Sequence, residues 1–178
     1  MAAYVAGERR AFDELFNRLA PRVHGFFLRS FSEAVADDLM QTTFLKLHRA
    51  RADFRSGATV RPWLFAIAAR VRLDELRRKY QLPESAGEEE LARAEDGQAN
   101  PDRSGVLDGD VRDRVRAAVS SLPESQRVIV HLHRFEGLTF PEIARALGVT
   151  EGAVKLRAFR AYEKLRQALA DIAPEGAA

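Results

Sequence analysis

Residues 139–169, TFPEIARALGVTEGAVKLRAFRAYEKLRQAL, predict two helices joined by a tight turn. Thr139 and Glu142 have the spacing of a capping box, in which each residue caps the other at the start of a helix. Gly148 lies where this short helix would end and the backbone would turn left-handed. Thr150 then suits the N-cap of a second, longer helix. The stretch therefore predicts a helix, a turn and a helix in close succession.

Small and apolar residues occupy the positions at which these two helices would meet. Ala144 allows the backbones to approach closely, and Val154, six residues after Gly148, would fill the angle between the helices. Ala, Gly and an apolar residue at these offsets are typical of the helix-turn-helix, whose second helix enters the major groove of DNA. The C-terminal part of the chain is therefore predicted to bind DNA.

The second helix of this pair has one apolar and one basic side. At about 100° per residue, one side is lined by Val154, Ala158, Ala161, Leu165 and Leu169. The other side carries five basic residues: Lys155, Arg157, Arg160, Lys164 and Arg166. A basic face alone is typical of many solvated helices, but the turn chemistry and the charge here agree on DNA binding. Leu156 and Phe159 also fall on the basic side, where an apolar group could touch a thymine methyl or a partner protein.

Composition excludes several classes of protein. The chain has 178 residues, a formal net charge of +2 and no cysteine, which excludes disulfides, thiolate metal sites and a cysteine nucleophile. No apolar run is long enough to cross a membrane, and the charged N-terminus does not resemble a signal peptide. His131 and His133 face different sides of a helix, and neither a serine triad nor a phosphate-binding glycine loop occurs. We therefore expect a cytoplasmic protein that is not an enzyme, inserts in no membrane and needs no metal or cofactor.

An acidic stretch divides the chain. Residues 81–110 carry nine acidic and two basic side chains, with six Gly or Pro residues among them, which predicts a flexible linker. Helical periodicity is present on both sides of it. We therefore predict an all-α fold of two small helical domains, the second a helix-turn-helix domain. The predicted bounds are 1–80 for the first domain, 81–109 for the acidic linker, 110–172 for the second domain and 173–178 for a tail.

The first domain is predicted to contain three helical stretches. They are residues 7–29, a helix that begins at Ser32 and a helix that begins at Pro62. Pro21 should kink or divide the first of them. Residues 51–60 are predicted to form a basic loop before the third helix. Residues 61–80 carry six basic and two acidic side chains, and so provide a second basic surface.

The second domain is predicted to begin with two helices ahead of the helix-turn-helix. Residues 110–121 form the first, with Val111, Val115, Ala118 and Val119 facing inward. A second helix opens at Glu124 and is stopped by Gly137.

Three sets of short motifs follow one another along the chain. The first set is Asp38–Gln41 and Thr43–Leu45, and the second is Trp63-Leu64, Ile67-Ala68, Asp74 and Arg77-Arg78. The third set is Leu122-Pro123, Gln126-Arg127, Glu136–Leu138, Glu142–Ala144 and Ala153–Lys155. In this order the motifs resemble those of bacterial sigma factors of the extracytoplasmic-function (ECF) group, and the resemblance covers residues 12–169. The three sets resemble, in turn, the helix that binds the polymerase clamp, the helix that reads the −10 element and the domain that reads the −35 element. Three positions depart from the family pattern and bear on promoter preference: Arg70, Leu156 and Tyr162.

The resemblance implies a factor that binds core RNA polymerase, recognises −10 and −35 promoter elements and promotes transcription initiation without catalysis. For polymerase binding it implies Asp38, Leu39, Gln41, Thr42 and Phe44. For the −10 element it implies Phe54, Arg55, Arg61, Trp63, Arg70, Arg72, Arg77 and Arg78. For the −35 element it implies Thr150, Lys155, Leu156, Arg157, Phe159 and Arg160. The expected partners are core RNA polymerase and promoter DNA, and an anti-sigma factor is a further candidate.

A different class of protein is the alternative. The helix-turn-helix would also suit a transcriptional regulator whose N-terminal domain is a sensor or a dimerisation module. Such a module does not require a basic helix with Trp63 or the polar surface at Asp38 and Gln41, and these features favour the sigma factor. A structural or adaptor protein would leave the two basic surfaces without a purpose.

Overall fold

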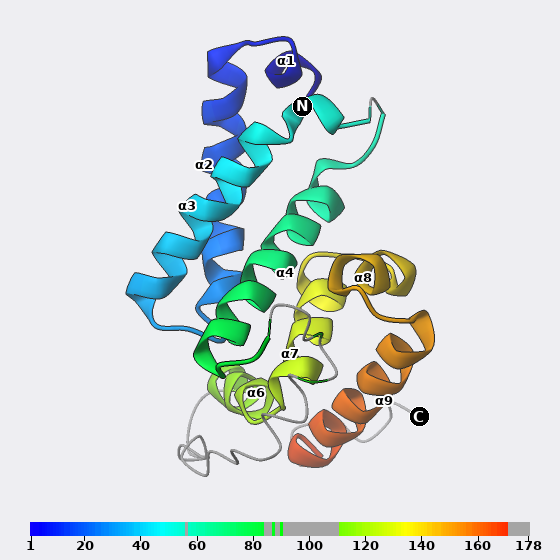
Figure 1. Ribbon diagram of the computed structural model, residues 1–178. Coiled ribbons are helices and arrows are strands. Elements are labelled where there is room, and N and C mark those ends of the chain that lie inside the picture. Colours follow the sequence, from blue (N-terminus) through cyan, green and yellow to red (C-terminus); the bar gives the residue numbers. More distant parts are fainter. Residues whose placement is uncertain (56, 84–86, 88–89, 91–110, 171–178) are drawn as a thin grey trace. The chain divides into compact units, whose positions relative to one another are not determined.

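The computed structural model of the chain describes residues 1–55, 57–83, 87, 90 and 111–170 (Figure 1). Regular structure in these residues is helical, without any strand, which confirms the predicted all-α class. The chain divides into two compact units, Met1–Ser85 with Arg145–Gly148, and Ala86–Ala144 with Val149–Ala178. Most of the predicted linker 81–109, and the predicted tail 173–178, lie outside the described residues, so the proposed domain bounds stay predictions.

The N-terminal unit is built on three long helices. Its elements are α1 (Ala2–Val5), α2 (Arg9–Phe27), α3 (Glu33–Arg49), the 3₁₀ turn η1 (Arg51–Asp53) and α4 (Val60–Lys79). Helix α3 packs against both α2 and α4; Figure 1 shows α3 in cyan crossing in front of the blue α2, with α4 in green. All three helices contribute fully or almost fully buried side chains: Val23, Phe26 and Phe27 from α2, Leu39, Phe44 and Leu47 from α3, and Leu64, Phe65 and Leu76 from α4. Each such side chain contributes roughly 1.5–3 kcal/mol when it leaves water, so the bundle rests on this core.

The structure differs from the sequence prediction at Pro21 and at the start of α4. Helix α2 continues through Pro21, so the expected division of this stretch does not occur. Pro21 is exposed, and on the solvent side of a helix a carbonyl that loses its N–H partner can bind water instead. Helix α4 begins at Val60, two residues before Pro62. Pro62 therefore lies in the first turn of α4, where its missing N–H removes no hydrogen bond within the helix.

Within the described residues 111–170, the elements are short or medium helices. They are α6 (Val111–Ser120), α7 (Glu124–Val130), the π-helical stretch η2 (His131–Phe135), α8 (Phe140–Leu147) and α9 (Glu151–Ala168). Helix α9 packs against both α6 and α7. Leu122, Val130 and Ala161 form a buried cluster, and Tyr162 and Leu165 of α9 pack on it. Gly137 has a φ of 71°, as expected of the residue that stops the helical segment before it.

The predicted inward face of α6 is only half correct. Ala118 and Val119 are buried, but Val111 and Val115 are 54% and 38% exposed. Apolar periodicity therefore extends further along this helix than the burial does. Helical spacing shows which residues share a side of a helix, but not where along its length a neighbouring element covers that side.

Candidate nucleic-acid interface

The turn between α8 and α9 has the local geometry that its sequence predicts. The backbone N–H of Thr139 donates to Glu142 Oε2 at 2.8 Å, and the N–H of Glu142 donates to Thr139 Oγ1 at 3.4 Å, which completes the capping box. Gly148 has a φ of 69°, in the left-handed region that glycine adopts without strain. Thr150 Oγ1 accepts a hydrogen bond from the N–H of Ala153 at 3.2 Å. The start of α9 is therefore fixed by side-chain hydrogen bonds that the sequence itself specifies.

The buried side of α9 also agrees with its pattern. Val154, Ala158 and Ala161 are buried, whereas Leu165 is only half-buried. Burial raises the pKa of the Tyr162 phenol, and the charge of Arg134 opposes that effect in part. The ring is therefore a neutral group that packs on the cluster at Leu122. Tyr162 thus belongs to the packing of the helix rather than to its outer surface.

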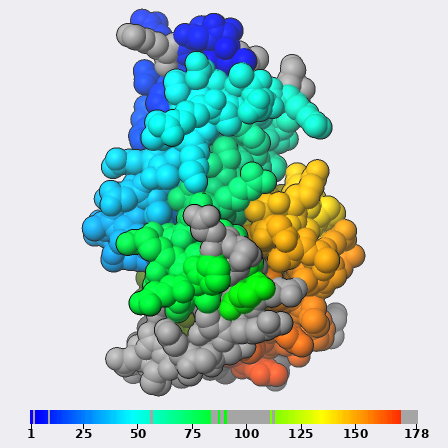
Figure 2. Space-filling view, in the orientation of Figure 1, coloured from blue at the N-terminus to red at the C-terminus, as the bar shows by residue number. Residues whose placement is uncertain are grey.

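The outer side of α9 carries most of the residues that the resemblance assigns to DNA. Lys155 and Arg160 are exposed, and so are Leu156 and Phe159, at 50% and 65%. Arg157 is half-buried and lies at the edge of this surface. The orange side chains of α9 form part of the molecular surface in Figure 2. The N-terminal half of the helix, up to Arg160, thus presents Lys155 and Arg160 together with two large apolar groups to solvent, and Lys164 and Arg166 are exposed further along.

Ion pairs neutralise this surface only weakly. Lys155 Nζ lies 2.8 Å from Glu151 Oε1, one helical turn earlier, and Arg166 pairs with Glu163. Exposed pairs of this kind contribute about 0–1 kcal/mol. A phosphate oxygen can therefore replace the carboxylate as the partner of such a cation at little cost.

A second exposed surface lies on α3. Asp38 and Gln41 are exposed, Thr42 is half-buried, and Leu45 is 51% exposed. These four residues are spaced at i, i+3, i+4 and i+7 and so share one side of the helix. The list of predicted polymerase-binding residues does not include Leu45, although its spacing from Asp38 and Gln41 is the signal that could have found it.

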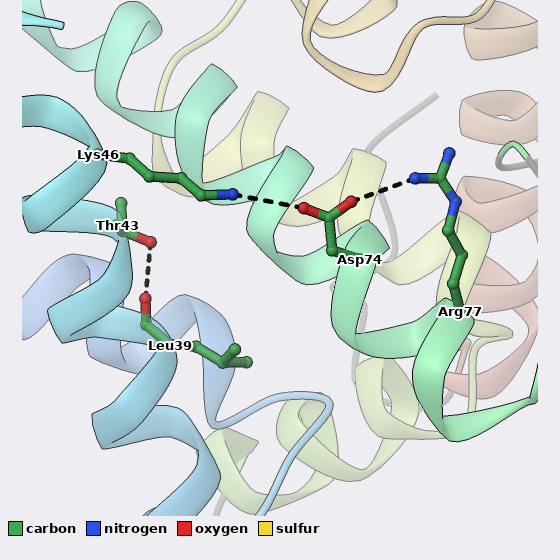
Figure 3. Close-up of polar contacts among 5 residues, drawn as sticks. All are labelled: Leu39, Thr43, Lys46, Asp74 and Arg77. Atoms are coloured by element: carbon green, nitrogen blue, oxygen red, sulfur yellow. Dashed lines mark hydrogen bonds and ion pairs between the residues drawn. The ribbon is translucent and has the colours of Figure 1, made fainter. Parts of the chain in front are cut away.

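Leu39 and Phe44, which the resemblance also assigns to polymerase binding, do not lie on that surface. Leu39 is 8% and Phe44 3% exposed. The Phe44 ring packs against Phe16 of α2 with centroids 4.7 Å apart. Thr43, which is also buried, donates its hydroxyl hydrogen to the Leu39 carbonyl at 2.8 Å (Figure 3). These residues hold α3 in the bundle and thereby orient its outer side.

Two aromatic rings are in contact near the start of α4. Phe54 precedes this helix, and Trp63 lies in its first turn. The rings of Phe54 and Trp63 lie 5.1 Å apart at an angle of 59°, and both side chains are half-buried. Arg55 is exposed beside Phe54, Arg61 is half-buried, and Arg70 is exposed further along α4. The structure thus brings these two aromatic side chains into contact, and basic residues precede and follow them along the chain.

Arg72 departs from its predicted place on the basic surface. Its side chain is only 1% exposed, so it is not accessible there. Ala68 and Leu76, four residues before and after it, are buried as well. The helical period therefore places Arg72 on the inner side of α4, a signal that the count of basic residues conceals.

Carboxylates accompany the basic end of α4. Asp74 Oδ2 lies 3.4 Å from Lys46 Nζ of α3, and its Oδ1 lies 3.1 Å from Arg77 Nη1, so this carboxylate bridges the two helices (Figure 3). Arg78 donates through Nε to Glu75 at 2.9 Å. This hydrogen bond, together with the charge of Glu75, raises the pKa of Arg78 above its usual range. Both arginines therefore have carboxylate partners within one helical turn.

Buried charges in the C-terminal unit are structural. Arg127 lies 3.4 Å from Glu124 and donates to the Leu122 carbonyl at 2.9 Å, which ties α7 to the turn before it. His131 Nε2 lies 3.3 Å from Glu136 Oε1, and both side chains are buried. Over the described residues, no group of three or more His, Cys, Asp or Glu is placed to hold a metal ion. None of the helices that can be described is long and apolar enough to span a membrane.

Comparison with known proteins identifies the family. The family model of sigma-70 region 2 matches residues 15–81, and that of sigma-70 region 4 matches residues 112–165. The RNA polymerase sigma factor CarQ of Myxococcus xanthus is 38% identical over 173 residues, 97% of each chain. The ECF RNA polymerase sigma factor SigM of Mycobacterium tuberculosis is 36% identical over 170 residues, 95% of this chain and 82% of SigM.

A solved structure has the same fold. The sigma factor RpoE from Bartonella quintana, crystallised in complex with the anti-sigma factor NepR, aligns with a TM-score of 0.63 at 23% identity, over 90% of this chain and 98% of RpoE. The fold, the two matched regions and the relatives agree with one another. The chain belongs to the sigma-70 family of RNA polymerase sigma factors, within the ECF group.

Proposed function

We propose that this ECF sigma factor, which binds core RNA polymerase, recognises −10 and −35 promoter elements and promotes transcription initiation, divides these tasks between two domains. Residues 1–80 would bind polymerase and the −10 element, and residues 110–172 the −35 element. The observation that carries this division is the match of regions 2 and 4 to separate parts of the chain. An exposed polar side of α3 and an exposed basic side of α9 support it.

The polymerase contact is proposed for the outer side of α3. Asp38, Gln41 and Thr42 provide its polar groups, and we add Leu45 as an apolar contact because half of its surface is exposed. The core of a protein interface is typically apolar and its rim polar. Leu39 and Phe44 act through the position of α3 and not through contact.

The −10 contact is proposed for the aromatic pair of Phe54 and Trp63 together with the basic groups of the preceding loop and of α4. Stacking of an unpaired base on an aromatic ring is worth about 1–3 kcal/mol, and Phe54 is accessible enough to take part. The basic groups of this surface are Arg55, Arg61, Arg70, Arg77 and Arg78; Arg72 is left out because it is buried. The partner of each cation would be a backbone phosphate, which positions the strand without reading its sequence.

The −35 contact is proposed for the N-terminal half of α9. Lys155 and Arg160 would bind phosphates or guanine edges, with Arg157 at the margin and Thr150 at the start of the helix. The −10 and −35 contacts lie on one chain. Promoter affinity is therefore higher when both contacts form, because the second is made at high effective concentration.

The remaining expectations follow from this assignment. Members of this family are transcription initiation factors, and we infer that this chain acts by binding and without catalysis. We also infer a cytoplasmic location, since its partners are polymerase and promoter DNA. An anti-sigma factor is proposed as a regulatory partner, by analogy with the complex of RpoE and NepR.

Run-off transcription with the cognate core polymerase tests the division of tasks. The wild-type chain should direct specific transcripts from genomic fragments, and the chain without core should direct none. Asp38→Ala combined with Gln41→Ala should reduce core binding. The matched control replaces Asp13 and Asn17, which are exposed on α2, and should bind core normally. If no fragment yields a specific transcript, the proposed function is wrong.

A further inference from the structure

The outer side of α9 has an apolar centre between cationic margins. Gly152, Leu156 and Phe159 are spaced at i, i+4 and i+7 and therefore lie along one line of the helix. Leu156 and Phe159 are two of the large apolar side chains that are most exposed among the described residues. A Cβ atom added to Gly152 would meet only Thr150 Oγ1, at 4.0 Å, so this end of the line is open. Lys155 and Arg160 lie to either side of the line.

This centre cannot form hydrogen bonds. Leucine and phenylalanine have no donor or acceptor, and glycine has no side chain. A base edge with donors or acceptors would lose its water partners against such groups, and each group left unpaired would weaken binding. The 5-methyl group of thymine is the apolar feature that the major groove presents. An apolar line on a groove-facing helix therefore fits a row of thymine methyl groups.

We propose that Leu156 and Phe159 recognise thymine methyl groups in the −35 element, while Lys155 and Arg160 contact the flanking phosphates. This inference rests on the proposed assignment of α9 to the −35 element. Gly152 leaves room for the duplex at the start of the helix, because it has no side chain to hold the bases away. The −35 element should then contain A·T pairs at the positions that face Leu156 and Phe159.

DNA is favoured over a protein partner by the surroundings of the apolar line. A cation on each side matches the two phosphate backbones that border a groove. The line also lies in the first turns of the second helix of a helix-turn-helix, the part that approaches base edges. A partner protein on the same residues is the competing outcome.

The experiment removes one methyl group at a time from the DNA. Holoenzyme is assembled from cognate core polymerase and the full chain, and its affinity is measured on a promoter found by run-off transcription. Each thymine of either strand of the −35 element is replaced in turn by deoxyuridine, which lacks only the 5-methyl group. Loss of one contacting methyl should weaken binding about fourfold, equivalent to about 0.8 kcal/mol. One or two positions should show this loss and the others none.

Variants of the protein connect each methyl to its side chain. With Leu156→Ala, deoxyuridine at one sensitive position should have no further effect, whereas Leu156→Met, which keeps an apolar side chain, should retain sensitivity. Phe159→Ala should act in the same way at a neighbouring position. The matched control is Val111→Ala, at an exposed valine outside α9, and it should keep the full fourfold effect at every sensitive position.

The outcomes separate this proposal from the proposed function. If Lys155→Ala with Arg160→Ala weakens promoter binding but every deoxyuridine is neutral, α9 binds DNA and methyl recognition is wrong. A −35 element without A·T pairs would overturn it equally. If the Leu156 and Phe159 variants weaken core or inhibitor binding while promoter affinity is unchanged, the apolar line is a protein-docking surface. If the lysine and arginine variants also leave promoter binding unchanged, the assignment of α9 to the −35 element fails as well.

Discussion

Substitutions of Thr150 can separate two contributions of this residue: one to the stability of the fold and one, which we propose, to promoter binding. Its hydroxyl oxygen accepts a hydrogen bond from Ala153 N–H at 3.2 Å, and its backbone is extended, with φ −74° and ψ 151°. Alanine at such an N-cap costs about 1 kcal/mol. Since about 1 kcal/mol moves the melting temperature of a small domain by roughly 4–8 °C, Thr150→Ala should lower the melting temperature of the C-terminal domain by about 5 °C.

Two further variants at this position isolate the role at DNA. Thr150→Ser keeps the hydroxyl and should leave both stability and promoter binding close to wild type. Thr150→Asp also keeps a cap acceptor, and its charge is favourable at a helix N-terminus by about 0.3–1 kcal/mol. Near a phosphate the same charge is repelled by about 1 kcal/mol at 4 Å in water. This variant should therefore be as stable as wild type but bind the promoter about fivefold more weakly.

Thermal unfolding followed by circular dichroism measures the first effect. Fluorescence anisotropy of holoenzyme on promoter DNA, at two fixed salt concentrations, measures the second. If Thr150→Ala melts like wild type, the hydrogen bond to Ala153 does not stabilise α9. If Thr150→Asp binds the promoter as tightly as wild type, the start of α9 lies away from the DNA backbone, and the proposed −35 interface is wrong.

Three other predictions concern the two surfaces. Replacing Asp38 and Gln41 together by Ala should weaken core polymerase binding about tenfold, equivalent to about 1.4 kcal/mol. The melting temperature should hardly change, because exposed substitutions usually alter stability by less than about 0.5 kcal/mol; a variant that unfolds early in a melting curve would contradict this. Phe44→Ala should destabilise the N-terminal domain by about 3–5 kcal/mol in urea unfolding, whereas Leu45→Ala should fold normally and bind core less tightly. Arg160→Ala should lower promoter affinity and reduce the slope of log K against log salt by about 1, and an unchanged slope would show that Arg160 contacts no phosphate.

The parts of the fold that the sequence predicts well are those that depend only on residues close to one another in the sequence. The capping box of Thr139 and Glu142, the left-handed Gly148 and the cap at Thr150 are each decided within four residues. Local hydrogen bonds and backbone sterics fix such features wherever the segment lies. The buried line of α9 that begins at Val154 was predictable for a related reason, because helical period alone decides which residues share a side.

The features that were missed concern the exposure of single side chains. Arg72 was counted among the basic residues of α4, although the helical period that it shares with Ala68 and Leu76 places it on the inner side of that helix. Leu45 and Val111 are apolar residues within helices, yet about half of the surface of each is exposed. Phe44 was assigned to polymerase binding by the resemblance, and its burial against Phe16 places it in the core. The sequence therefore predicted the helices and the broad location of each surface better than the exposure of single side chains.

The division of α9 into a buried and an outer side has an evolutionary consequence. Val154 and its buried neighbours maintain the fold, while the exposed residues Lys155, Leu156, Phe159 and Arg160 contribute little to it, because exposed substitutions are nearly neutral for stability. After gene duplication, a few changes on that outer side can redirect one copy to a new set of promoters without passing through an unfolded intermediate. The same separation makes the outer side of α9 a practical target for building mutually insulated transcription circuits.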